Sequence, residues 1–134
     1  MKEKISLSKN HKRIIGVTMK ILEKDMDEMM ILLNADQNEP SYELIKDIPE
    51  SELKEKILVV KKVKLLIKEM YSRYSLGRET LQISRILEAK KSYLWTILCD
   101  SYSDKIKRYG DFNENDSKEY DKKIDELLNL INEI

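Results

Sequence analysis

The sequence of 134 residues is poor in the residues on which most small catalytic and metal sites depend. It contains one cysteine, one histidine, three glycines and two prolines. An internal disulfide needs two cysteines, and a di-iron centre in a helical bundle needs paired Glu-x-x-His motifs, so the composition excludes both. Few glycines and prolines leave little material for the turns of an all-β protein or for a glycine-rich phosphate loop. We therefore expect one all-α domain over residues 1–134, with no cofactor and no metal site.

Long apolar runs are also missing from the sequence. No stretch is long enough to span a membrane, and the basic residues 1–13 are not followed by the apolar segment of a signal peptide. The single Cys99 fits a reducing compartment, where unpaired thiols are common. These features predict a cytoplasmic protein that has no membrane partner.

Apolar residues at steps of three and four predict four helices. The first is expected over residues 9–33, with Ser8 as its N-cap, and the second starts at the Asp47-Ile48-Pro49-Glu50 motif with an acidic N-cap. Gly77 is expected to end the second helix. The third helix is expected over residues 78–108, and the fourth follows a capping box at residues 116–119. The residues expected to face inward on the third helix are Ile83, Leu87, Leu94, Leu98, Tyr102, Ile106 and Tyr109.

Four helices with short connections are most simply an antiparallel up-down four-helix bundle with long helices. In such a bundle the charges become separated, although 25 basic and 25 acidic residues sum to zero. The net charge is +5 over residues 1–24, −8 over residues 25–55, +6 over residues 56–78 and −5 over residues 111–134. Antiparallel packing would place the first and third of these blocks at one end of the bundle, which predicts a charged docking surface.

No set of residues in the sequence indicates catalysis. His11 is best interpreted as a solvated or cap-packing side chain, with a phosphorelay histidine as the alternative. Cys99 fits an inert core thiol better than a nucleophile, because no histidine base is expected near it. Asp25, Asp27 and Glu28 are interpreted as a solvated helix face, with cation binding or an acid-base pair as the alternatives. We therefore expect a protein that is not an enzyme and has no catalytic, cofactor-binding or metal-binding residues.

A basic cluster interleaved with aromatic residues is the candidate interaction face. Basic side chains attract phosphates and aromatic rings can stack on bases, so a groove for single-stranded nucleic acid is one interpretation. The stronger interpretation is docking of an acidic protein surface, since most of these aromatic residues fit inward positions. The residues of this predicted basic face are Lys61, Lys62, Lys64, Lys68, Arg73, Arg78, Arg85, Lys90 and Lys91.

Three stretches of residues 42–134 resemble the α-helical domain of GINS subunits, which belong to a replicative-helicase accessory complex. They are YELI at residues 42–45 followed by Ile48-Pro49, RILEAKKSYL at residues 85–94, and DSKEY at residues 116–120. The resemblance implies a non-catalytic subunit that assembles with paralogues and bridges the helicase to other proteins of DNA replication.

The composition, the helix pattern and the resemblance together predict a non-enzymatic helical interaction or scaffold protein in a multiprotein assembly. Its partners would be proteins, in a homo-oligomer or a hetero-oligomer. The alternative is a small helical regulator or adaptor that binds one protein partner, as a phage, plasmid or host protein. A single-stranded nucleic-acid-binding protein is the weaker third interpretation.

Overall fold

The computed structural model describes residues 6–35 and 39–134. Within these ranges it contains helices and no β-strand. The prediction of an all-α protein is confirmed. The chain divides into two compact units, a first unit over Met1–Arg78 and a second unit over Glu79–Ile134. The elements are α1 (Lys9–Leu33), α2 (Glu50–Arg73), α3 (Ile83–Cys99), α4 (Ser103–Ile106), the 3-10 helix η1 (Lys107–Tyr109) and α5 (Glu114–Asn132).

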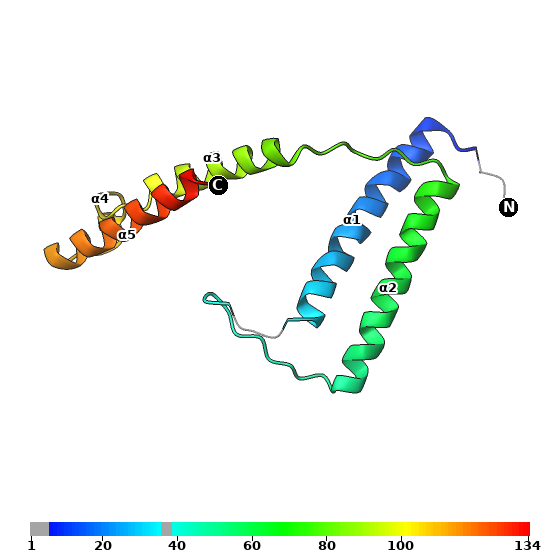
Figure 1. The fold of residues 1–134 in the computed structure, drawn as a ribbon, viewed down its shortest axis with the longest axis horizontal. Helices are drawn as coiled ribbons and strands as arrows, with labels where there is room; N and C mark the ends of the chain where they lie inside the picture. Colours follow the sequence, from blue (N-terminus) through cyan, green and yellow to red (C-terminus); the bar gives the residue numbers. More distant parts are fainter. Residues whose placement is uncertain (1–5, 36–38) are drawn as a thin grey trace. The chain divides into compact units, whose positions relative to one another are not determined.

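The first unit is a pair of long helices, α1 and α2, which lie side by side and run in opposite directions (Figure 1). Met19 of α1, Ile67 of α2 and Leu76 beyond α2 form its buried cluster. All seven α2 residues predicted to face inward are buried or half-buried, because steps of three and four keep them on one stripe. The seven residues are Leu53, Ile57, Val60, Val63, Ile67, Met70 and Tyr74.

The start of α1 agrees with the prediction, whereas the start of α2 does not. The helix α1 spans the predicted residues 9–33, and the Ser8 side chain caps it by accepting a hydrogen bond from the main-chain N–H of His11 at 3.1 Å. The α2 N-cap is Pro49, and no side chain caps this end. The expected Asp47 cap is wrong, because the helix begins at Glu50, so that Pro49 takes the N-cap position and Asp47 lies two residues before it.

The break after α2 occurs as predicted, but a different residue makes it. The helix ends at Arg73, and Ser75 adopts a left-handed conformation with φ of 50°. The N–H of Leu76 then bonds to the carbonyl oxygen of Tyr71 at 3.0 Å, and the Leu76 side chain is buried. Gly77 has no positive φ, so the expectation that this glycine makes the turn is wrong.

The second unit is an antiparallel pair of α3 and α5. Lys91 of α3 bonds to Ile134, just beyond α5, and Trp95, one turn later on α3, bonds to Asn132, the last residue of α5, so the two helices run in opposite directions. Ile124 and Leu128, both on α5, are the buried residues of this unit. The steps of three and four predict that Leu127, and not Leu128, follows Ile124 on the inward side. In the structure Leu127 is 45% exposed and its neighbour Leu128 is buried.

The predicted long third helix over residues 78–108 is wrong. The observed helix α3 begins at Ile83 and ends at Cys99, and the chain then turns into α4 and η1. Side chains of α5 compete for the backbone at this point. The Tyr120 hydroxyl donates to the carbonyl oxygen of Ser101 at 2.6 Å, and Asp121 accepts from the N–H of Ser103 at 2.8 Å.

Two further expectations for the second unit need correction. The helix α5 begins at Glu114, after an Asn113 cap that accepts from the N–H of Asn115 at 2.9 Å, so the capping box at residues 116–119 is wrong. Asn113 lies three residues before Asp116, and because its side chain caps the helix there, Asp116 is already inside the first turn. Several α3 residues expected to face inward are exposed within their unit, because α5 covers a single side of α3. They are Ile83, Leu87, Leu94 and, beyond α3, Tyr109.

Burial among the described residues is sparse. Six of the described residues are buried: Met19, Val60, Ile67, Leu76, Ile124 and Leu128. Two of them lie in α2 and two in α5, one lies in α1, one follows α2, and α3 has no buried residue. The contacts define the two helix pairs, and the antiparallel four-helix bundle stays a prediction.

We predict that Ile67→Ala lowers the free energy of unfolding of the protein by about 2 to 4 kcal/mol, because it opens a cavity in the first unit. Ile67 is 6% exposed, whereas Leu65 on the same helix is 67% exposed. Leu65→Ala is the matched control and should change the free energy by less than about 0.5 kcal/mol. Urea denaturation followed by circular dichroism measures both. Equal losses for the two variants would contradict the described core.

Candidate protein-interaction surfaces

The predicted basic face is divided between the two units. Four of its lysines lie on α2, Arg73 ends that helix, and Arg78 follows it, while Arg85, Lys90 and Lys91 lie on α3. Within α2, Lys61, Lys64 and Lys68 follow one another at steps of three and four and share one side of the helix, whereas Lys62 points about 100° away from Lys61. A common face for all nine residues stays a prediction.

Lys64 is engaged by α1 and is not a free cation for a partner. Its Nζ lies 2.7 Å from Oδ1 of Asp27, and both side chains are about half exposed. An ion pair at this exposure contributes on the order of 0.5 kcal/mol. Its main effect is to fix the register of α1 against α2, with the acidic part of α1 facing a lysine of α2.

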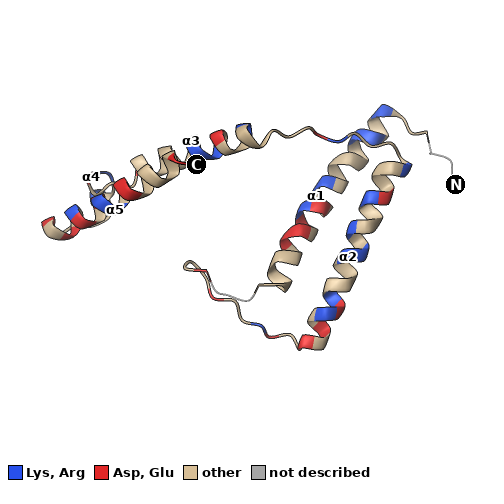
Figure 2. Ribbon diagram, viewed as in Figure 1, with Lys and Arg blue, Asp and Glu red and all other residues tan. Residues whose placement is uncertain are grey.

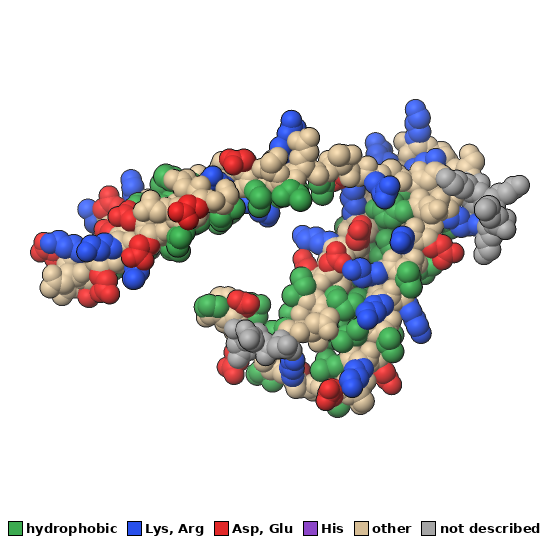
Figure 3. Space-filling model, viewed as in Figure 1, with side chains coloured by type: hydrophobic (Ala, Val, Ile, Leu, Met, Phe, Trp, Pro, Cys, Tyr) green, Lys and Arg blue, Asp and Glu red, His purple; other side chains and the backbone are tan. Residues whose placement is uncertain are grey.

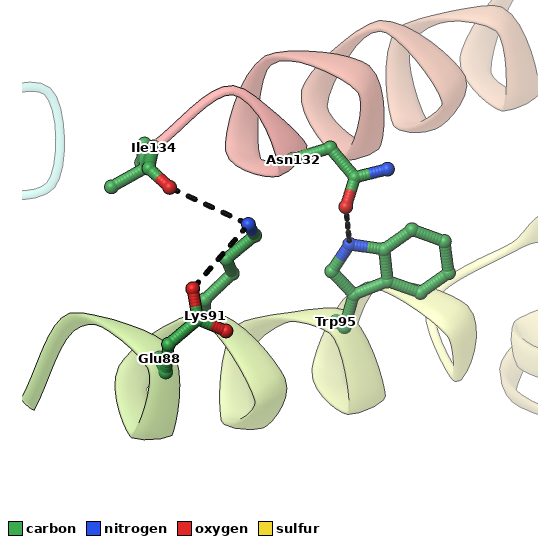
Figure 4. A network of polar contacts seen from close by, with 5 residues as sticks. All are labelled: Glu88, Lys91, Trp95, Asn132 and Ile134. Atoms are coloured by element: carbon green, nitrogen blue, oxygen red, sulfur yellow. Dashed lines mark hydrogen bonds and ion pairs between the residues drawn. The ribbon is translucent and has the colours of Figure 1, made fainter. Parts of the chain in front are cut away.

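Lys91 is also engaged, at the contact of α3 with the last residues of the chain (Figure 4). Its Nζ donates to the main-chain oxygen of Ile134 at 3.4 Å and lies 3.8 Å from Oε1 of Glu88. One turn further along α3, Nε1 of Trp95 donates to Oδ1 of Asn132 at 3.0 Å. Both side chains therefore hold α5 against α3, and Lys91 is removed from the predicted basic face.

Antiparallel packing in the first unit brings basic residues together at one end of the helix pair (Figure 2). The start of α1 carries Lys9, Lys12 and Arg13, and it lies beside the end of α2, which carries Lys68 and Arg73. At the opposite end, the uncharged residues 29–33 of α1 lie beside the start of α2, which carries three glutamates and two lysines among residues 50–56. The acidic residues of α1 lie between positions 23 and 28, where Asp27 pairs with Lys64 of α2. The first unit therefore has a basic end, and its acidic α1 residues lie beside the lysines in the middle of α2.

The aromatic residues near the basic positions have different roles. Tyr71 and Tyr74 pack against the buried cluster of the first unit, so their rings are not available to stack on bases. Tyr93, on α3, is 67% exposed. It follows Lys90 by three residues, which places the two side chains on neighbouring positions of the helix surface.

The largest surface feature of both units is exposed apolar side chains (Figure 3). On α3 they recur at steps of three and four, so they share one side of the helix. The bond from Lys91 to Ile134 places the exposed end of α5 beside this part of α3. We call the exposed apolar residues on this side of α3 the α3 apolar face: Ile83, Ile86, Leu87, Tyr93, Leu94 and Ile97.

A shallow hollow lies where the connection between α1 and α2 meets the helix ends. Leu33, Ile48 and Leu53 form part of its apolar lining, and Glu50 and Lys54 stand at its rim. These two charged groups are 3.9 Å apart and pair with each other. The hollow therefore offers an apolar contact surface.

The residues considered for catalysis have structural surroundings. Nδ1 of the exposed His11 lies 2.9 Å from Oγ of Ser8, so the histidine supports the α1 cap. Cys99 is a half-buried free thiol at the last position of α3. Within residues 6–35 and 39–134, no group of three or more His, Cys, Asp or Glu side chains could hold a metal ion. Nor is any helix in these ranges long and apolar enough to cross a membrane.

A polar corner joins the end of α3 to α5, and the sequence patterns did not reveal it. Asp121 accepts from both the N–H and the hydroxyl of Ser103, at 2.8 and 2.7 Å, and the Tyr102 hydroxyl donates to Oδ1 of Asp125. This hydrogen bond, with desolvation and the negative charge of Asp125, raises the pKa of Tyr102 from 10.0 to about 12. The one available signal was Asp121 and Asp125 at i, i+4 spacing, which is common on any helix.

Comparison of the chain with protein families, curated proteins and solved structures finds no match. The resemblance to GINS subunits therefore stays a prediction. Function has to be inferred from the surfaces of the two units.

We predict that Tyr102 ionises with a midpoint near pH 12 in the folded protein, above its ordinary pKa of 10.0. The stabilisation by its hydrogen bond is complete below pH 10 and is lost as the pH rises through 12. The difference in tyrosinate absorbance between the wild type and Tyr102→Phe isolates this group. Asp125→Asn should lower the midpoint towards 10, and Asp116→Asn, on the exposed first turn of α5, should not. A wild-type midpoint near 10 would contradict the described bond.

Proposed function

We propose that this protein is a non-enzymatic helical interaction or scaffold protein that works in a multiprotein assembly. The observation that carries the proposal is the α3 apolar face, where Ile83 is 74% exposed and Tyr93 is 67% exposed. Exposed apolar faces of this extent mark protein-interaction surfaces in soluble proteins. An aromatic residue beside aliphatic ones is the composition typical of interface centres.

The small size of the second unit supports the same proposal. It comprises residues 79–134 and buries two residues, Ile124 and Leu128. A chain segment this short buries too little apolar surface to be more than marginally stable by itself. Packing against another surface would remove the α3 apolar face from water and supply the missing stabilisation, at roughly 25 cal/mol per Å² buried.

Two geometries would bury this face. In the first, the protein assembles with partner proteins, as a homo-oligomer or a hetero-oligomer. In the second, the two helix pairs close into the antiparallel four-helix bundle predicted from the sequence, which would bury the α3 apolar face against apolar residues such as Val59 and Leu66 of α2. The exposure of Val59 and Leu66 in the first unit favours neither geometry over the other.

The kind of assembly is a narrower proposal. A GINS-like role as an accessory subunit of a replicative helicase, in the cytoplasm, rests on the resemblance in residues 42–134. A small regulator or adaptor that binds one partner would use the same apolar face. Recovery of replication proteins by affinity capture from the native host separates the two roles, since an adaptor would recover a different single partner.

We predict that Ile83→Ser with Ile97→Ser lowers the mass of the protein in light scattering at micromolar concentration. The wild type should be a dimer or larger, because it buries these side chains in an assembly. The matched control is Ala89→Ser with Ser92→Ala, which changes exposed α3 positions outside the apolar face. Circular dichroism checks that each variant keeps its helices.

Closure into a bundle within one chain gives a different result in the same experiment. The Ile83→Ser, Ile97→Ser variant would then lose free energy of unfolding, by about 1 to 3 kcal/mol, without any change in mass. A monomeric wild type that also retains no partner from a host extract would contradict the proposed function.

Direct binding of single-stranded nucleic acid is a second candidate function, favoured by the exposed Tyr93 beside Lys90. We predict for this case that Tyr93→Ala weakens binding of a labelled oligonucleotide by about five- to a hundredfold, since stacking of one base contributes about 1 to 3 kcal/mol. Tyr71→Phe, in the core of the first unit, is the control. Absence of binding at low salt would eliminate this function.

A further inference from the structure

The outward face of α2 carries a row of lysines at regular spacing. Lys54, Lys61 and Lys68 are each seven residues apart, and seven residues make two helical turns, so the three side chains share one face. Leu58 and Leu65 follow Lys54 and Lys61 by four residues and lie beside them. Both leucines are exposed and lie on the side of α2 opposite the buried Val60 and Ile67. We call these five residues the α2 lysine row.

The outward face of α5 carries glutamates at the same spacing. Glu119, Glu126 and Glu133 are also seven residues apart, and Leu130 follows Glu126 by four residues, as Leu65 follows Lys61. This face is opposite the buried Ile124 and Leu128, and Leu130 is exposed. We call these four residues the α5 glutamate row.

The two rows have few internal ion pairs. Within the described residues, neither Lys61 nor Lys68 lies in an ion pair, and Glu133 is unpaired as well. Glu126 lies 3.6 Å from the Nζ of Lys123, in a pair of exposed side chains that water screens.

The acidic character of the α5 row is not uniform along the helix. Lys122 and Lys123 lie between Glu119 and Glu126, so they weaken the field of the first part of the row. Glu126 and Glu133 have no lysine between them. The matching positions on α2 are Lys61 and Lys68, which flank Leu65. The strongest complementarity is therefore between two lysines and two glutamates, each pair beside one exposed leucine.

We propose that the α2 lysine row of one copy of this chain docks on the α5 glutamate row of a second copy. The contact has the form of a short coiled-coil seam, with leucines in the middle and opposite charges at the flanking positions, which set the choice of partner. The proposal rests on the proposed function as an assembly protein and specifies one partner, the chain itself.

Charge complementarity is the reason for choosing a second copy. Every chain carries both rows, so each copy offers a basic seam and an acidic seam of equal spacing. Two equal lysine rows would repel each other, and so would two glutamate rows, so the contact joins unlike surfaces. Such a head-to-tail contact leaves one row free at each end, and repetition of it produces a ring or a filament. The α3 apolar face takes no part in this contact.

The test uses two charge reversals and their mixture. Lys61→Glu with Lys68→Glu makes both rows acidic, and Glu126→Lys with Glu133→Lys makes both rows basic. Each variant alone should associate at least about tenfold more weakly than the wild type in sedimentation velocity at low salt, because every head-to-tail contact then joins like charges. An equimolar mixture should recover the wild-type association, since the acidic α2 of one variant fits the basic α5 of the other.

Two controls distinguish an effect of the charged rows from an effect of the net charge of the chain. Lys56→Glu with Lys62→Glu changes the net charge equally but lies off the α2 lysine row, so it should associate as the wild type does. Circular dichroism verifies that all variants keep their helices. In a mixture with this control, the Glu126→Lys, Glu133→Lys variant can dock its basic α2 on a free acidic α5 but offers no acidic row itself, so it should shorten the assemblies of the control and not extend them.

The outcomes decide between a second copy and other occupants. Recovery of association in the mixture of the two row variants supports the second copy. A monomeric wild type, unchanged association of both row variants, or failure of the mixture to recover association overturns the inference. Loss of mass in the Ile83→Ser, Ile97→Ser variant with unchanged association of the row variants would leave the proposed function standing while this inference fails.

Discussion

The main constraint on this protein is the small amount of apolar surface that a pair of helices can bury. Two helices in contact cover one stripe on each other, whereas the helices here carry apolar residues on more than one side. The consequence is six buried residues and a long series of exposed isoleucines and leucines within the described chain. Because burial of apolar surface is the dominant favourable term in folding, helix pairs of this kind gain stability from whatever covers their remaining faces. In the proposed assembly, stability and recognition would therefore depend on the same side chains.

Polar interactions in this structure mainly position helices that apolar contacts hold together loosely. The Lys64 to Asp27 pair fixes the register of the first unit, and Trp95 to Asn132 does so for the second. The corner at Ser103 and Asp121 replaces main-chain hydrogen bonds that a continuous third helix would have made. Each of these contacts is at least partly exposed to water, so each contributes modestly to stability. Their value lies in selecting one alignment from several that the apolar stripes would allow.

Apolar periodicity predicted the existence of the long helices and the inward stripe of α2, and local chemistry at helix ends was less predictable. The α1 range and the inward stripe of α2 follow from apolar spacing over many residues, where single errors average out. Helix ends depend on one or two groups, such as Asn113 capping α5 in place of Asp116, or Ser75 with its positive φ at the break that was expected at Gly77. The end of α3 depends on Tyr120 and Asp121, about twenty residues away in sequence. No local pattern contains such contacts.

For the candidate surfaces, too, residue spacing predicted part of the result and helix packing determined the rest. Nine lysines and arginines form one basic cluster along the sequence, but in the structure Lys64 pairs with Asp27 and Lys91 bonds to Ile134. Packing thus removes some charges from the surface and leaves others in rows, and those rows depend on which helix face is turned away from the partner helix. A net charge of zero over the whole chain is compatible with this arrangement, because the basic and acidic rows lie on different helices. Which charges face outward is therefore determined by the register of the helix pairs, which the exposed ion pairs and apolar stripes set jointly.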